Sequence, residues 1–159
     1  MLALNEMSLV YKRLMVPATR RSEPGAGKGR SDLAVAVVFT SVDATVEALR
    51  TAGALANRLN ARIDLLVPQI VPYHLPISSP PVLLDFTEKR FRVMASESPV
   101  ETTVHIYLCR DRLEALIQVL RPNSLVVIGD GKSWWRTAEN RMAKQLRRAG
   151  HEVIMVETE

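Results

Sequence analysis

The sequence of 159 residues is long enough to bury one hydrophobic core, and its 47% hydrophobic and 24% charged residues are ordinary for a globular protein. A single cysteine excludes an intrachain disulfide framework and a cysteine-based zinc site. The net charge of +4 comes from residues 1–31, which hold six basic and two acidic side chains, so the balanced remainder argues against a nucleic-acid-binding domain.

Residues 1–31 are predicted to form a basic, flexible extension ahead of one domain at residues 32–159. The run VYKRLMV allows a short strand within the extension, but the ATRRSEPGAGKGRS that follows is polar and rich in glycine and charge. The run GAGKGRS is not a phosphate-binding loop, because its spacing differs from GxxxxGK[ST] and it precedes a strand instead of following one.

No apolar run approaches the ~20 residues that span a bilayer, and the start of the chain lacks the apolar core of a signal peptide. We therefore expect a cytoplasmic protein with no membrane partner.

The first half of the domain predicts a strand, a helix and a strand. Residues 33–39 (LAVAVVF) are continuously apolar, as in a strand that is buried on both faces. Ser41 or Asp43 can cap the helix that follows, and apolar side chains at helical spacing continue it to about Leu59. A second strand is expected at residues 63–67.

The middle of the chain is less regular. Residues 68–81 contain five prolines and predict an irregular crossing, after which a proline pair can start a helix over residues 82–94. Alternating apolar residues predict a third strand at 100–109. Asp111 and Glu114 form a capping box, so a further helix is expected to begin there.

The C-terminal part of the chain reads as strand, glycine loop, helix and strand. Leu125 to Ile128 is a short apolar run, and Gly129 is expected to open the loop after it. Thr137 can cap the next helix and Gly150 can end it. A last apolar strand is expected at residues 153–156.

Strands that alternate with helices imply an α/β fold with parallel strands and right-handed crossovers. We predict a three-layer sandwich around a five-stranded parallel sheet of order 3-2-1-4-5. This order places a topological switch point between the first and fourth strands, where ligands of such sheets bind. The candidate cofactor-binding residues at this point are Thr40, Ser41, Gly129, Gly131, Lys132 and Ser133. Loop amides beside Lys132 can hold an anion, and the alternative is a tight structural turn.

Two segments, VDATVEALRTAGALANRLNARIDLLVPQIVP and DRLEALIQVLRPNSLVVIGDG, resemble parts of the universal stress protein family. The resemblance covers residues 33–157 by pattern, and the joint order of the segments carries it. It implies the adenine nucleotide alpha hydrolase-like fold of that family. It also implies a homodimer that pairs through the final strand, residues 151–156.

ATP-binding members of that family carry G-x-x-G, nine residues and G-[ST] after the fourth strand, and usually an aspartate at the end of the first. This sequence keeps Gly129, but Lys132 stands at the second glycine and Thr40 at the aspartate. Glu139 and Asn140 stand at the G-[ST] pair. The resemblance therefore implies a nucleotide site that is lost or weakened.

These observations favour a non-enzymatic module that acts by self-association or by binding an unidentified protein partner, with no cofactor. The alternative is a nucleotide or phosphate sensor that uses the loop Gly129–Arg136, with ATP or AMP as its ligand. A third reading is an adaptor whose basic residues 1–31 dock on acidic surfaces or nucleic acid.

Catalytic and metal-binding motifs are missing from the sequence. The three histidines show no metal-ligand spacing, and no nucleophile elbow, HExxH or paired carboxylate motif occurs. Cys109 is expected to be a buried, inert cysteine. Trp134 and Trp135 are expected to pack on the domain instead of stacking on nucleic acid, since no wide basic groove accompanies them.

Overall fold

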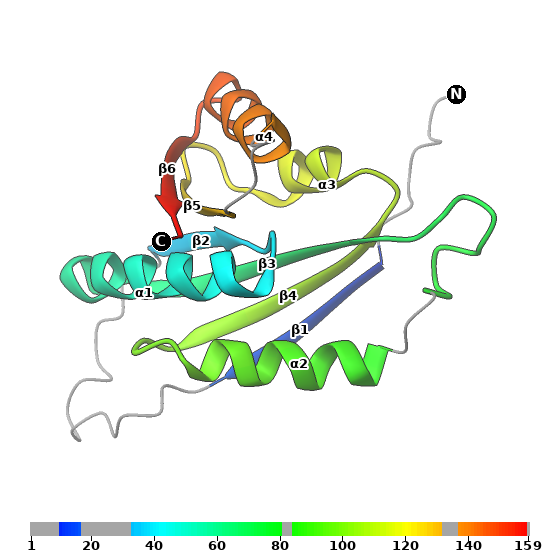
Figure 1. The fold of residues 1–159 in the computed structure, drawn as a ribbon, viewed down its shortest axis with the longest axis horizontal. Helices are drawn as coiled ribbons and strands as arrows, with labels where there is room; N and C mark the ends of the chain where they lie inside the picture. Colours follow the sequence, from blue (N-terminus) through cyan, green and yellow to red (C-terminus); the bar gives the residue numbers. More distant parts are fainter. Residues whose placement is uncertain (1–9, 17–32, 81–83, 132–136, 159) are drawn as a thin grey trace.

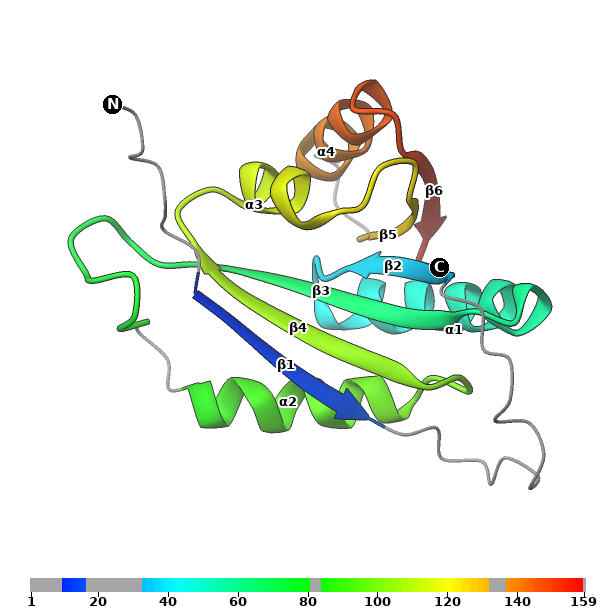
Figure 2. The ribbon, with the colours of Figure 1, turned by 180° about the vertical axis from the view of Figure 1, so that it is seen from behind.

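A computed structural model describes residues 10–16, 33–80, 84–131 and 137–158. In this part of the chain, one twisted sheet lies between two pairs of helices (Figure 1). Helices α1 and α2 pack on one face of the sheet, and α3 and α4 pack on the other (Figure 2). The predicted three-layer α/β sandwich is confirmed.

The sheet has six strands in the order β1-β4-β3-β2-β5-β6. The strands are β1 (Val10–Val16), β2 (Ala34–Val38), β3 (Arg62–Ile70), β4 (Thr102–Cys109), β5 (Leu125–Asp130) and β6 (Glu152–Glu157). The last five are the predicted strands, and all four pairings among them are parallel. Their order β4-β3-β2-β5-β6 is the predicted 3-2-1-4-5.

Strand β1 adds an antiparallel edge to this sheet. It is the VYKRLMV run of the N-terminal segment, and it pairs with β4 from Val10 opposite Leu108 to Val16 opposite Thr102. The rest of residues 1–31, where we predicted a flexible extension, lies outside the described residues. Part of the N-terminal segment therefore belongs to the sheet of the main domain.

The four helices are α1 (Val42–Leu59), α2 (Leu84–Ser96), α3 (Arg112–Val119) and α4 (Thr137–Arg148). Ser41 caps α1 and Asp111 caps α3, each by accepting a hydrogen bond from an amide in the first turn. Thr137 is the first residue of α4, and the position before it lies outside the described residues. Gly150 ends α4 with a φ of 98°, the left-handed conformation expected there.

Two strands extend further than their apolar runs predict. Strand β3 continues through Pro68 to Ile70, because the neighbouring β4 pairs with it along that length. Strand β5 continues to Asp130, because β6 pairs with it up to Glu157. Gly129 is therefore a strand residue and not the start of a loop.

The connection from β3 to α2 is held by one side chain from the end of β4. The Arg110 guanidinium donates hydrogen bonds to the carbonyl oxygens of Val71 and Leu75, at 3.0 and 2.9 Å, and to that of Pro72. It also lies 5.2 Å from the centroid of the Tyr73 ring. The proline-rich crossing is thus fixed by bonds to its backbone.

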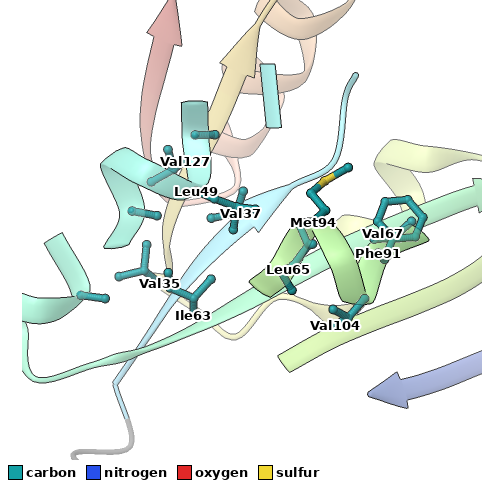
Figure 3. Packing of buried hydrophobic residues seen from close by; sticks show 14 of the residues in the cluster. Val35, Val37, Leu49, Ile63, Leu65, Val67, Phe91, Met94, Val104 and Val127 are labelled. Atoms are coloured by element: carbon teal, nitrogen blue, oxygen red, sulfur yellow. The ribbon is translucent and has the colours of Figure 1, made fainter. Parts of the chain in front are cut away.

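Each face of the sheet has its own hydrophobic cluster. The larger one packs Leu49 and the alanines of α1, together with Phe91 and Met94 of α2, on the strands (Figure 3). The second places Leu116 of α3 and Leu146 of α4 against the opposite face. The small side chains of these alanines allow α1 to approach the sheet closely.

Candidate functional site

The ends of β2 and β5 meet at the predicted switch point and are joined there. The Thr40 hydroxyl donates a hydrogen bond of 2.9 Å to the carbonyl oxygen of Gly129. The amide of Thr40 donates to the hydroxyl of Thr45, at 3.1 Å, and Thr45 is fully buried. The structure thus places two of the predicted site residues side by side, with Thr40 as a bridge between the strands.

Gly129 lies directly against the first turn of α1. A Cβ atom at this position would stand 2.0 Å from the carbonyl oxygen of Ala44 and 2.5 Å from its carbonyl carbon. Ala44 is itself completely buried. The absence of a side chain at Gly129 therefore serves the packing of β5 on α1, and no room for a ligand is left between these two elements.

Ser41 and Gly131 lie beside this contact and closer to solvent. Ser41 has an extended backbone, and its hydroxyl accepts a hydrogen bond of 3.4 Å from the Ala44 amide as the N-cap of α1. A Cβ atom at Gly131 would stand 3.9 Å from that hydroxyl, so the two residues are neighbours. The other two predicted site residues, Lys132 and Ser133, lie outside the described residues.

A cavity of about 490 Å³ opens at this place. Its charged lining consists of Asp43, Glu47 and Arg50, and its polar lining includes Ser41 and Thr158. Arg50 is already paired with Glu47, three residues earlier on α1. Among the described lining residues, two carboxylates against one paired guanidinium oppose the approach of a phosphate group.

Thr158 lines the cavity and is held in place by Asp130. The amide of Thr158 donates a hydrogen bond of 3.2 Å to the Asp130 carbonyl oxygen, and the Thr158 hydroxyl bonds to the same oxygen. Asp130 is buried, with 5% of its surface exposed. The sequence offered no signal for this contact, because it depends on the register between β5 and β6.

Two arginines that we did not predict as site residues lie at the end of β2. Arg112, at the start of α3, donates a hydrogen bond of 3.0 Å to the Phe39 carbonyl oxygen. Arg90 of α2 lies 5.8 Å from the centroid of the Phe39 ring and 5.9 Å from that of Phe91. Both guanidinium groups are engaged with the end of the strand, which they stabilise.

Cys109 is buried, as predicted, and 3% of its surface is exposed. Burial raises the pKa of its thiol to about 11, and the nearby Asp111 carboxylate acts in the same direction. The thiol is thus protonated at neutral pH and is a poor nucleophile. Among the described residues, no group of histidine, cysteine and carboxylate side chains has the geometry to hold a metal ion.

His105 and His151 have structural partners. The Nδ1 atom of His151 accepts a hydrogen bond of 3.2 Å from the amide of Ser124 and so links the starts of β5 and β6. The Nε2 atom of His105 lies 3.2 Å from Asp64 Oδ1 across β4 and β3. Neither ring belongs to the switch point.

Comparison with solved structures finds a similarity in fold, whereas the comparisons of the sequence find no match. No protein-family model matches the sequence, and no curated protein matches it. A solved structure of a universal stress protein in complex with cAMP is similar to this chain, with a TM-score of 0.44 and 17% identity, over 80% of this chain and 98% of that one. Similarity of this degree does not identify a family, so the fold is defined by the strand order itself. Among the described helices, none is long and apolar enough to cross a membrane.

Proposed function

We propose that this protein is a universal stress protein-like, non-enzymatic α/β module that acts by self-association through the outer edge of β6, or by binding a partner protein there. In this proposal its nucleotide site is lost or weakened. The observation that carries the proposal is the position of β6 at the end of the sheet. Within the described residues, β6 has a strand neighbour on one side only.

The direction of the β6 amides shows which backbone groups face outward. The amides of Glu152 and Thr158 donate to β5, at Ser124 and Asp130. Because amide direction alternates along a strand, the amides of Val153 and Met155 face away from β5. Such an edge can pair with a strand of a second chain.

The side chains of β6 suit a covered edge. Ile154, Met155 and Val156 are each half-buried in the single chain and retain apolar surface. On the outer side, the Arg147 guanidinium donates a hydrogen bond of 3.0 Å to the Val153 carbonyl oxygen. Arg147 therefore occupies one end of the edge, and the region around Met155 is the part open to a partner. Antiparallel pairing of two β6 strands about a two-fold axis would make one continuous sheet.

Met155→Pro is the substitution that tests this edge. Proline removes the outward amide and leaves the hydrogen bonds to β5 in place, so the domain should stay folded while pairing is lost. The matched control is Ile154→Pro, which removes an inward amide and should destabilise the domain. Light scattering coupled to size exclusion should give a dimer for the wild type at micromolar concentration and a monomer for Met155→Pro. A monomeric wild type that also captures no partner through β6, or an unchanged dimer in the variant, would contradict the proposal.

The contacts at the switch point support the proposal that the nucleotide site is lost or weakened. The Thr40 hydroxyl already bonds to Gly129, Ala44 fills the space beside that glycine, and the neighbouring cavity carries Asp43 and Glu47. A nucleotide would have to displace these contacts and overcome the carboxylates.

The second candidate function is a nucleotide or phosphate sensor built on the loop Gly129–Arg136. One observation favours it, which is the cavity between the N-terminal end of α1 and Gly131. Titration calorimetry with ATP, AMP and cAMP tests it, with Lys132→Ala as the variant. Binding below about 1 mM that Lys132→Ala weakens would favour the sensor. Heats equal to dilution for all three nucleotides would eliminate it.

A further inference from the structure

A second cavity, of about 470 Å³, lies away from the switch point and away from the β6 edge. It is formed by the first residues of β2, by β3 and β4, and by the connection from α3 to β5. Its lining residues Ala36, Leu66 and Tyr107 belong to the hydrophobic cluster under α3 and α4, and Leu59 is the last residue of α1. α3 has only eight residues, so it covers little of the long strands β3 and β4.

A polar cluster lies on the sheet face inside this cavity. Asp64 Oδ1 is 3.2 Å from His105 Nε2 and 3.6 Å from Arg62 Nε. The side chains of these three residues are only 13–28% exposed. Strands of a parallel sheet normally carry apolar residues where they are covered by helices. Burial of charged side chains costs free energy, so this cluster is expected to have a specific role.

Arg62 has a buried donor that its neighbours do not use. Its Nε atom is shielded from solvent and has no hydrogen-bond partner among the described residues. The distance to Asp64 is too long for a hydrogen bond, and Asp64 is the partner of His105. The Arg62 side chain is 28% exposed, but its buried Nε–H has no acceptor within hydrogen-bond distance among the described residues. A buried donor is costly without an acceptor, and a bound ligand can supply one.

The charge of the cavity selects an anion as that ligand. Arg13, Arg62 and Arg121 line it, and Asp64 is the one carboxylate among its described lining residues. Burial alone would raise the pKa of Asp64, but the hydrogen bond and charge of His105, together with the charge and the longer polar contact of Arg62, outweigh it and lower this pKa. Asp64 is thus ionised and bonded to His105. Three arginines against this one carboxylate give the described lining of the cavity a net positive charge.

Part of the remaining lining is apolar. Leu33 lies just before β2 and Leu59 ends α1, while Leu120 and Pro122 come from the connection between α3 and β5, which also contributes the polar Asn123 and Ser124. A volume of this size suits a small organic molecule. The ligand therefore combines an anionic head with an apolar body.

We propose that this cavity is a binding site for a small organic anion, whose carboxylate or phosphate head is held by Arg62 with Arg13 and Arg121 and whose body contacts the apolar lining. Arginine suits this role because its planar fork binds both head groups through two parallel hydrogen bonds. The site is independent of the proposed function at β6, because the two share no residue.

Phenyl phosphate and phenylacetate are the probes, with benzyl alcohol as the neutral control and inorganic phosphate as the control without a body. They are titrated into the full chain while the ring C–H signals of His105 are followed by NMR. We expect at least one of the two anions to shift these signals with a dissociation constant below about 1 mM, and benzyl alcohol to leave them unchanged. The anion that binds more tightly identifies the head group.

Two substitutions test the role of the residues. Arg62→Ala should weaken binding at least tenfold, and Arg62→Lys should lose part of the affinity because a point charge lacks the fork. Arg58→Ala is the matched control, since Arg58 is exposed on α1 and does not line the cavity. Ala34→Leu fills the cavity without a change of charge and should also abolish binding, which keeps the test valid if Arg62→Ala fails to fold.

Three results would overturn the proposal. The first is no shift of the His105 signals with either anion. The second is equal affinity in the wild type, Arg62→Ala and Ala34→Leu. The third is equal affinity for inorganic phosphate and phenyl phosphate that Arg58→Ala reduces as much as Arg62→Ala, which indicates attraction to the basic surface as a whole.

Discussion

Replacement of Gly129 by alanine places a methyl group where the structure has no space for it. The added Cβ would lie 2.0 Å from the carbonyl oxygen of Ala44 and 3.1 Å from its Cα. Both atoms belong to the backbone of the first turn of α1, and Ala44 is completely buried. A rotamer change cannot relieve this overlap, so either β5 or the start of α1 has to move.

The cost has two parts. Overpacking of a close-packed interior costs about 1–3 kcal/mol. Movement of β5 also breaks the hydrogen bond from the Thr40 hydroxyl to Gly129, which contributes about 1 kcal/mol. Gly129→Ala should therefore lower the free energy of unfolding by about 2–4 kcal/mol, or the melting temperature by about 5–15 °C for a domain of this size.

Urea unfolding followed by circular dichroism measures this loss, and two variants serve as references. Thr40→Val removes only the hydrogen bond and should cost about 1 kcal/mol. Gly131→Ala adds a methyl group whose nearest neighbour is 3.9 Å away, so it should change stability by less than about 0.5 kcal/mol. If Gly129→Ala proves as stable as Gly131→Ala, the packing of β5 on α1 is not as described.

Three further predictions concern single side chains. Asp64→Asn should cost about 1–2 kcal/mol at pH 7, measured by urea unfolding, because it removes the charged partner of His105. The pKa of Asp64 is lowered in the folded protein, so this stabilisation is present above the unfolded pKa of about 3.9 and is lost as the pH falls through the folded value. The difference in the free energy of unfolding between the wild type and Asp64→Asn should therefore be smaller at pH 3 than at pH 7. An equal difference at both pH values would contradict this role of Asp64. Cys109, with a thiol pKa of about 11, should resist a thiol reagent at pH 7 and react at least about 100-fold faster in denaturant; equal rates would show an accessible thiol. Arg147→Ala should cost about 0.5–1.5 kcal/mol and strengthen self-association in sedimentation experiments, because it uncovers the outer carbonyl of Val153; weaker association would place the contact elsewhere.

The central strands could be predicted because their signal is local. Residues 33–39 and 125–128 are apolar without interruption, and capping residues mark the helices between them. The alternation of elements and the handedness of crossovers predict a parallel α/β sheet, and the order 3-2-1-4-5 is one of the orders that such sheets adopt. The sequence pattern did not predict the full lengths of β3 and β5, because these two strands continue as far as the neighbouring strand offers hydrogen bonds.

The candidate sites depend on pairings between distant parts of the chain. Asp64 and His105 meet because β3 and β4 lie side by side in one register, and 41 residues separate them in sequence. Gly129 was predicted to open a loop at the ligand-binding end of the sheet. In the structure it lies in β5, and a Cβ atom there would meet the backbone of α1.

The pairing of β1 with β4 affects how the protein folds during its synthesis. Val10 pairs with Leu108 and Val16 with Thr102, so β1 is made before the other described strands and waits for a partner that is made close to a hundred residues later. Contacts this distant in sequence form slowly, and the five parallel strands do not require β1 for their own pairing. During synthesis the backbone of β1 therefore stays unpaired until β4 has been made, and β1 then pairs with it.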